Sequence, residues 1–313
     1  MTTKCALVFP GQGSQSVGMM TAYDGAPGLR DTFDEASEAL AVDLWSLVSI
    51  GPAEELNQTV NTQPVMLTAG IALLRAWRAA GGPEPGLVAG HSLGEYTALV
   101  AADALRFGDA LRLVRFRAQV MQEAVPEGTG GIAAILGLDD EAIQATCAEA
   151  GQGQVLEAAN FNAPGQVVIA GHREAVERGM AVAKKRGAKR AVMLSMSVPS
   201  HCSLMRGAAE RLAERLAGLS LQAPRIEVLN NVDVAALKDP SAIRDGLVRQ
   251  LYNPVQWVRT VRELHRRGAM RVIECGPGGV LTTLNKRSAP DLEALALKDK
   301  DQLAQLAAEM AQE

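Results

Sequence analysis

Ser92 is the residue whose type and surroundings point most clearly to covalent chemistry. It stands at the centre of the segment 90–94, which reads Gly-His-Ser-Leu-Gly. A G-x-S-x-G pattern between a strand and a helix is typical of a nucleophile elbow, a tight turn that exposes the serine hydroxyl. The apolar stretch 87–90 predicts that strand, and 93–102 predicts the helix. The alternative interpretation is an ordinary helix N-terminus with a serine near its cap.

Two backbone N–H groups could serve such a nucleophile. The turn would direct the N–H of Leu93 toward the oxygen of an attacked carbonyl, and Gln12 could supply a second donor from the loop after the first predicted strand. That loop superficially resembles a dinucleotide-binding fingerprint, but Ser16 stands where the third glycine is required. We therefore reject a dinucleotide site there.

A serine nucleophile needs a base at neutral pH, most often a histidine, and the chain has four. His91 adjoins the nucleophile, and neighbouring side chains on an extended segment point to opposite faces. His172 opens a predicted helix, where we expect a cap, and His265 lies in a charged helix, where we expect a solvated side chain. His201 follows Val-Pro-Ser in a loop at a predicted domain junction, a common place for site residues. We therefore predict His201 as the base.

No carboxylate stands out as the group that would orient His201. A backbone carbonyl or an amide side chain could hold the imidazole instead, and the polar segment 250–253, Gln-Leu-Tyr-Asn, could supply either. The pattern leaves these alternatives open.

The predicted helix 109–124 places Arg117 on its apolar face. At 100° per residue most of its long polar side chains gather on the opposite side, whereas Arg117 falls between Leu113 and Met121. An unpaired buried charge is costly, so this guanidinium needs a partner. One interpretation is a structural salt bridge to a nearby acid. The other is a bound carboxylate held by two parallel hydrogen bonds.

The elements that must position these residues alternate along the chain. Strands are predicted at 5–9, 87–90, 226–230, 271–275 and 295–297, and the helices between them include 64–80, 93–102, 109–124 and 205–216. This alternation predicts an α/β fold with a mostly parallel sheet flanked by helices. Binding sites in such sheets gather at the carboxyl ends of the strands, where the loops that carry Gln12 and Ser92 fall.

The segment 128–196 predicts a second, smaller unit. Its strands are expected at 131–138, 155–162, 166–170 and 189–194, with helices at 139–150 and 173–186. The order βαββαβ is typical of a ferredoxin-like unit. We therefore expect residues 1–127 and 197–313 to form one discontinuous catalytic core, with 128–196 inserted as a small subdomain.

Composition restricts the class of protein. Of the 313 residues, 48% are hydrophobic and 21% charged, and the net charge is −4, which argues against disorder and against a dedicated nucleic-acid binder. No apolar run approaches the roughly 18 residues of a membrane helix, and the N-terminus lacks the layout of a signal peptide. Four widely spaced cysteines indicate neither a zinc site nor a disulfide framework. We expect a cytoplasmic α/β enzyme with no bound metal.

Longer motifs extend over nearly the full length. They are Phe-Pro-Gly-Gln-Gly-Ser-Gln at 9–15, Gly-His-Ser-Leu-Gly-Glu-Tyr at 90–96, Arg117 with Met-Gln-Glu-Ala-Val-Pro at 121–126, the segment 160–171, Ser-Val-Pro-Ser-His at 197–201, Asn-Asn-Val-Asp at 230–233, Gln-Leu-Tyr-Asn-Pro at 250–254 and Gly-Pro-Gly at 276–278. On these motifs the chain closely resembles the malonyl-CoA:acyl carrier protein transacylases, which load malonyl units for fatty acid synthesis. The resemblance implies an α/β-hydrolase-like core with a ferredoxin-like insertion, in agreement with the predicted elements.

The resemblance also implies roles for the candidate residues. Ser92 would be the nucleophile and His201 the base, with oxyanion-hole N–H groups from Gln12 and Leu93. Arg117 would bind the free malonyl carboxylate. The implied reaction is a ping-pong transfer of malonyl from malonyl-CoA, through a malonyl-serine ester, to the phosphopantetheine thiol of holo acyl carrier protein. It implies no bound cofactor, and it suggests a monomer.

Three further positions take their expected roles from the resemblance alone. The position matching Gln250 offers its main-chain carbonyl to the histidine in this family, which would explain the missing acid. Gln63 and Asn162 fall where the family has polar residues that line the site.

A docking surface for the carrier is also expected. Acyl carrier proteins are acidic, as the resemblance implies, so this net-negative chain needs a local basic patch. Lys189 and Arg190 in the insertion, beside the basic run 184–186, and Lys286 and Arg287 in the core could line a cleft from both sides. The alternative for these residues is a solvated helix end.

Other functions remain to be distinguished. A serine thioesterase or carboxylesterase would use the same Ser92 and His201, although Arg117 and the missing triad acid weigh against it. A non-catalytic scaffold would not need these three residues intact. A free-standing acyltransferase that serves a polyketide synthase would share the chemistry and differ only in its pathway.

Overall fold

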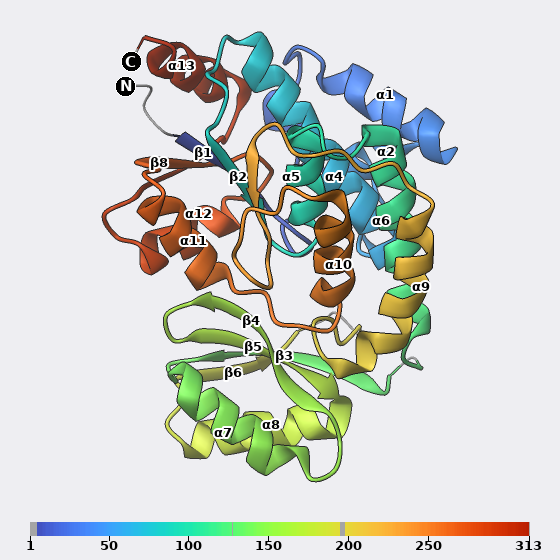
Figure 1. Cartoon of the computed structure of the whole chain (residues 1–313), viewed down its shortest axis with the longest axis vertical. Helices are drawn as coiled ribbons and strands as arrows, with labels where there is room; N and C mark the ends of the chain where they lie inside the picture. The colour runs from blue at the N-terminus through green and yellow to red at the C-terminus, as the bar shows by residue number, and fades with distance from the viewer. Residues whose placement is uncertain (1–4, 127, 195–197, 313) are drawn as a thin grey trace.

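The computed structural model of the chain describes residues 5–126, 128–194 and 198–312. Figure 1 shows a larger body of strands covered by helices above a smaller sheet with two helices of its own. The larger body holds a five-stranded sheet in the order β7-β2-β1-β8-β9, and all its pairings are parallel. Its strands are β1 (Cys5–Phe9), β2 (Leu87–Gly90), β7 (Glu227–Leu229), β8 (Arg271–Glu274) and β9 (Glu293–Ala296).

β1 and β2 are apolar throughout because helices cover both faces of the parallel sheet. In β1, Leu7 and Phe9 pack into one hydrophobic cluster, and the alternate residues Ala6 and Val8 pack into another. The first cluster takes side chains from α1 (Leu29–Leu40), α2 (Leu44–Ser49), α3 (Ala53–Leu56), α4 (Thr59–Ala79), α5 (Gly94–Ala101), α6 (Phe107–Glu123), α9 (Arg206–Ala217), α10 (Pro240–Gln250) and α13 (Lys300–Met310). The second takes them from α11 (Trp257–Arg266) and α12 (Val280–Ser288). The predicted α/β architecture with a mostly parallel sheet is confirmed.

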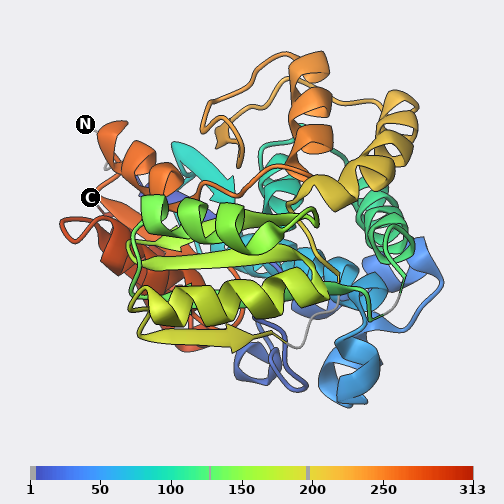
Figure 2. The same cartoon turned by 90° about the horizontal axis from the view of Figure 1, so that it is seen from below.

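The smaller sheet is antiparallel, in the order β4-β5-β3-β6. Its elements are β3 (Gly130–Leu136), α7 (Asp140–Gly151), β4 (Leu156–Ala163), β5 (Gln166–His172), α8 (Arg173–Lys185) and β6 (Arg190–Met193). The order along the chain is the predicted βαββαβ, and the turn between β4 and β5 falls at the expected Pro164-Gly165. α7 and α8 cover one face of this sheet, as the view from below in Figure 2 shows.

The other face of the small sheet rests on the larger body. Ile132, Val168 and Ala170 pack there with Cys202, which lies beyond the insertion. Two main-chain hydrogen bonds of Val255, each 2.9 Å, also tie β4 to the segment before α11. The division into a core of 1–127 and 197–313 and a subdomain of 128–196 stays a prediction, and Glu127, Met196 and Ser197 at its boundaries lie outside the described residues.

Two expectations differ from the structure. The helix predicted from Pro64 begins earlier, at Thr59, so this proline lies inside α4 and the added turn carries Gln63. His172 does precede α8, but its side chain makes no cap hydrogen bond. Its Nδ1 accepts a 3.0 Å hydrogen bond from the Val155 N–H, and its own N–H donates to the Val155 oxygen at 2.9 Å, so the residue is paired with the segment before β4. Across the described ranges, no helix has the length and apolar character to cross a membrane.

Candidate active site

Ser92 occupies a strained turn between β2 and α5. Its φ is +51°, a left-handed value that a non-glycine residue rarely adopts. The turn closes tightly: a Cβ on Gly90 would lie 1.9 Å from the carbonyl of Gly94, and one on Gly94 would lie 2.0 Å from the Phe9 carbonyl oxygen. Both positions therefore require glycine, because a side chain there would collide with the neighbouring backbone, as the nucleophile-elbow interpretation predicts.

His201 is buried beside this serine. Its Nε2 lies 2.7 Å from Ser92 Oγ, and its Nδ1 lies 2.8 Å from the main-chain oxygen of Gln250. Because a carbonyl can only accept, Nδ1 must carry the proton, which leaves Nε2 free to accept the proton of Ser92. A backbone carbonyl thus orients the imidazole and takes the position that the acid of a catalytic triad would occupy.

The imidazole is held in its neutral form. Burial, and then the positive charge of Arg117, lower the pKa of His201 to about 3. Both causes disfavour the protonated ring, so the base is available throughout the neutral range.

Arg117, on α6, is buried next to the nucleophile. Its Nη2 donates to Ser92 Oγ at 3.2 Å and to Gln250 Oε1 at 3.1 Å, and its Nη1 donates to Gln63 Oε1 at 2.9 Å. Its Nε has no hydrogen-bond partner, and no carboxylate forms an ion pair with this guanidinium, in the part of the chain that is described. The structure therefore gives no support to a structural salt bridge, and the site holds a buried cation with a spare donor.

The side chain of Gln250 links several parts of the site. Its Nε2 donates to the main-chain oxygen of Ser92 at 3.0 Å and to Glu95 Oε2 at 2.8 Å. Glu95 is 3% exposed, and burial raises its pKa to about 7. Sequence reasoning missed this acid. An acid three residues after the candidate nucleophile, in an otherwise apolar helix, was a signal that its side chain is buried and makes polar contacts near the site.

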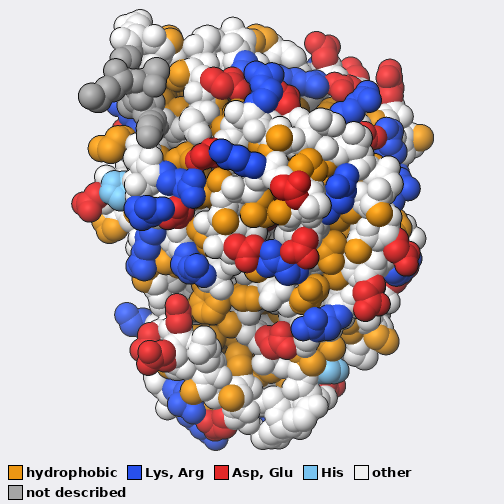
Figure 3. Space-filling model, in the orientation of Figure 1, with side chains coloured by type: hydrophobic (Ala, Val, Ile, Leu, Met, Phe, Trp, Pro, Cys, Tyr) orange, Lys and Arg blue, Asp and Glu red, His pale blue; other side chains and the backbone are white. Residues whose placement is uncertain are grey.

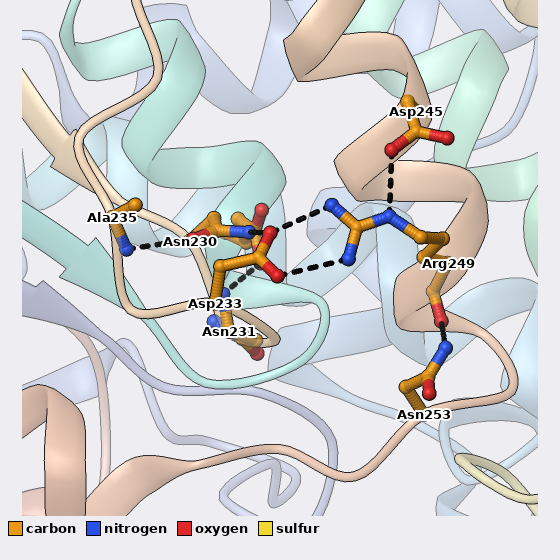
Figure 4. Close-up of polar contacts among 8 residues, drawn as sticks. Asn230, Asn231, Asp233, Ala235, Asp245, Arg249 and Asn253 are labelled. Atoms are coloured by element: carbon orange, nitrogen blue, oxygen red, sulfur yellow. Dashed lines mark hydrogen bonds and ion pairs between the residues drawn. The ribbon is translucent and has the colours of Figure 1, made fainter.

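Asn231, also missed from the sequence, supports the elbow from the loop after β7. Its Oδ1 accepts the Ser92 N–H at 2.7 Å, and its Nδ2 donates to the Gly90 oxygen at 2.7 Å. Figure 4 shows how the loop is held: Arg249 reaches from α10 to both carboxylate oxygens of Asp233, at 3.0 and 2.6 Å. Arg249 and Gln250 thus hold the loop and the His201 ring from one end of α10.

The two predicted oxyanion donors face the same cavity. Gln12 and Leu93 both line it, and neither backbone N–H has a partner within the described ranges. The Ser92 N–H is already taken by Asn231, so it cannot serve this purpose.

The cavity has a volume of about 150 Å³ and lies between the two sheets. The larger body contributes Ser92, His201 and Arg117, and the small sheet contributes Asn160, Asn162 and Val168. The insertion therefore forms one wall of the site. Gln63 and Asn162 both line the cavity where the sequence placed them.

The expectation for His91 is wrong. Its ring lines the cavity, and its Nε2 lies 2.8 Å from Asn162 Oδ1. Alternation along an extended segment fails here because Ser92 has a positive φ, which turns the chain between the two side chains.

The four residues of the expected carrier patch are exposed, but none lines the cavity. Arg287 donates to Gln166 Oε1 at 2.5 Å and to the Pro164 oxygen at 2.9 Å, so it fastens α12 to the β4–β5 turn. Figure 3 shows basic and acidic side chains mixed over most of one face of the molecule, with several basic side chains gathered at the left of the view. The docking role of Lys189, Arg190 and Lys286 stays a prediction.

Comparisons with known proteins agree with this geometry. The model of the acyl transferase domain matches residues 6–310. The malonyl CoA-acyl carrier protein transacylase of Salmonella typhimurium is 57% identical over 298 residues, which cover 95% of this chain and 96% of that one. An acyl-carrier-protein S-malonyltransferase structure from Burkholderia pseudomallei has 56% identity and a TM-score of 0.96 and covers 97% and 99% of the two chains. A malonyl-transacylase in complex with a type II PKS acyl-carrier protein has 51% identity and a TM-score of 0.96 and covers 98% and 99%.

Proposed function

The chain belongs to the acyl transferase family and, within it, to the malonyl-CoA:acyl carrier protein transacylases, and on this premise we propose how its residues perform the transfer. It transfers malonyl from malonyl-CoA to the phosphopantetheine thiol of acyl carrier protein, which supplies extender units for fatty acid biosynthesis. The observation that carries the residue assignment is the buried Arg117, which lines the same cavity as Ser92 and forms no ion pair with a carboxylate among the described residues.

In the first half-reaction Ser92 attacks the thioester carbonyl of malonyl-CoA. His201 Nε2 takes the hydroxyl proton as the new C–O bond forms. The N–H groups of Gln12 and Leu93 stabilise the oxyanion, each by about 100- to 1000-fold in rate. Collapse of the intermediate breaks the C–S bond, and the proton on His201 leaves with CoA.

Arg117 selects the acyl group by its charge. A malonyl group carries a carboxylate, which can accept from the Nη atoms of the guanidinium and displace their weaker neutral contacts. An acetyl group has no carboxylate and leaves this buried cation without an ion pair.

In the second half-reaction the carrier thiol attacks the malonyl-serine ester. His201 takes the thiol proton and returns a proton to Ser92 Oγ as the ester bond breaks. Transfer must outrun hydrolysis, and we propose that the Arg117–carboxylate pair fixes the ester in a poor geometry for water. The malonyl-serine ester should therefore decay faster in Arg117→Ala, and an unchanged lifetime would reject this role.

Carrier binding is proposed for Lys189, Arg190, Lys286 and Arg287. Reversing the charges of Lys189 and Arg190 should slow transfer to the acidic carrier and leave malonyl loading from CoA intact. Equal losses in both half-reactions would contradict this assignment. Because Arg287 also makes intramolecular contacts, it is a poor first target.

We further propose that the enzyme acts in the cytoplasm as a monomer and needs no bound cofactor. Ser92 and His201 provide both the covalent attachment and the proton transfers of the reaction, so the chemistry calls for no other group. The expectation of no nucleic-acid or membrane partner rests on the net charge of −4 and on the apolar patterning of the chain.

The deciding experiment is intact-protein mass after brief incubation with malonyl-CoA, beside acetyl-CoA and methylmalonyl-CoA, with Ser92→Ala as the control. We expect a malonyl adduct that persists alone, disappears when holo carrier protein is added, and is absent from the variant. An adduct that decays to free malonate at the same rate with or without carrier would instead identify a hydrolase.

The pathway is tested by the choice of carrier. The relative solved with a type II PKS acyl-carrier protein gives specific support to a polyketide alternative. Transfer rates to fatty acid carriers and to polyketide carriers, measured side by side, distinguish the two.

A further inference from the structure

A buried carboxylate that the proposed mechanism does not use lies beneath the nucleophile. Glu95 belongs to α5, is 3% exposed, and reaches none of the cavity surface. Its Oε2 accepts from the Asn231 N–H at 2.9 Å and from Gln250 Nε2 at 2.8 Å. Both partners are themselves in contact with the elbow.

The contact with Glu95 determines which way the Gln250 amide faces. The same Glu95 oxygen accepts from the Asn231 N–H, so it is an acceptor, and the NH₂ end of the amide must turn toward it and the amide oxygen away. That oxygen accepts from Arg117 Nη2 at 3.1 Å. Reversal of the amide would direct an NH₂ group at a guanidinium that has no acceptor, which is unfavourable.

The same chain of contacts joins the Arg117 cation to the Glu95 carboxyl group. The guanidinium of Arg117 forms no direct ion pair among the residues described, and the Gln250 amide lies between it and Glu95. An amide polarised by a cation on one side and an acceptor oxygen on the other strengthens both hydrogen bonds in a low-dielectric interior.

We infer that Glu95 is a positioning residue for the acyl-carboxylate subsite: through the Gln250 amide it holds Arg117 in place for the substrate. This inference rests on the proposed role of Arg117. Glu95 touches neither substrate nor the reacting atoms, so its effect must pass through the guanidinium.

The consequence is selective. Glu95→Gln keeps the shape of the side chain but replaces one acceptor oxygen with an NH₂ donor, so it holds the Gln250 amide less firmly in the orientation that serves Arg117. We expect the second-order rate of malonyl loading from malonyl-CoA to fall about tenfold, while loading from acetyl-CoA and labelling by a neutral fluorophosphonate change less than twofold. A merely structural role would lower all three rates together.

The experiment compares wild type, Glu95→Gln, Arg117→Ala and the double variant by intact mass, with the exposed Glu141→Gln as a matched control. In the Arg117→Ala background, Glu95→Gln should add no further loss of malonyl loading. Equal loss with all three reagents, no loss, or full additivity in the double variant would each overturn the inference. If Arg117→Ala itself shows no selective loss, the proposed carboxylate site fails, which is a separate result.

A second variant decides the case if Glu95→Gln does not fold. Gln250→Met removes the linking amide and retains the main-chain carbonyl that orients His201. Because the same amide also donates to the Ser92 carbonyl oxygen, all three rates should fall, and the malonyl rate should fall further than the other two; an equal loss with the three reagents would reject the link.

Discussion

Removing the charge of Arg117 should change the pH dependence of the nucleophile. The guanidinium Nη2 and the His201 Nε2 both contact Ser92 Oγ, at 3.2 and 2.7 Å, so the two nitrogens are at most about 6 Å apart. At an effective dielectric constant of about 20, a unit charge at that distance disfavours protonation of the imidazole by about 3 kcal/mol, or about 2 pH units.

The sign of the effect follows from the charge. The pKa of His201 is about 3 because burial and Arg117 both oppose the protonated ring. Arg117→Gln removes the second cause, so the pKa should rise toward about 5. In wild type the rate of Ser92 labelling should be flat from pH 8 down to pH 5, whereas in the variant it should fall near pH 5.

The assay is the second-order rate of labelling by a neutral fluorophosphonate, read by intact mass, since this reagent has no carboxylate to bind Arg117. Arg112→Gln, on the exposed side of the same helix, is the matched control and should keep the wild-type profile. Circular dichroism confirms folding at each pH. Superimposable profiles for wild type and Arg117→Gln would refute the electrostatic argument.

Two predictions concern the scaffold, and urea denaturation measures both. Gly90→Ala should lower the free energy of unfolding by about 3 kcal/mol or more, because its Cβ has no room beside Gly94. Gly207→Ala, with open space around it, is the control and should change the free energy of unfolding by no more than about 1 kcal/mol. Similar values for the two variants would contradict the tight-turn account. Leu7→Ala, at a position that is 0% exposed in the central strand, should cost about 2–5 kcal/mol without lowering the labelling rate of the folded protein. A loss below about 1 kcal/mol would show that the core there can collapse.

The parts of the site that the sequence predicted are those encoded locally. The elbow at Ser92 is a local pattern, since its glycines, strand and helix are adjacent in the chain. Arg117 was found because helical periodicity shows that one residue interrupts an apolar face. His201 followed from a count of four histidines and from its place at the edge of the insertion. For Ser92 and Arg117 a few neighbouring residues contain the whole signal, whereas His201 required elimination among the four histidines of the chain.

The network around the elbow could not be found in that way. Asn231, Gln250 and Glu95 meet through contacts that span 136 to 158 positions of the chain, and no periodicity relates them. The error at His91 has a different cause, because a single positive φ at Ser92 reversed an otherwise sound rule. A rule that assumes regular extended backbone cannot predict strain at a single residue.

The proximity of Arg117 and His201 bears on how the enzyme distinguishes acyl groups. An unpaired guanidinium keeps the base weak, since its charge opposes protonation of the ring. A malonyl carboxylate that pairs with Arg117 cancels that charge, so it should raise the basicity of His201 at the step where the Ser92 proton must be taken. An acyl group without a carboxylate gains neither the ion pair nor the stronger base. On the roles proposed for Arg117 and His201, one buried cation would contribute to selectivity twice, in binding and in proton transfer.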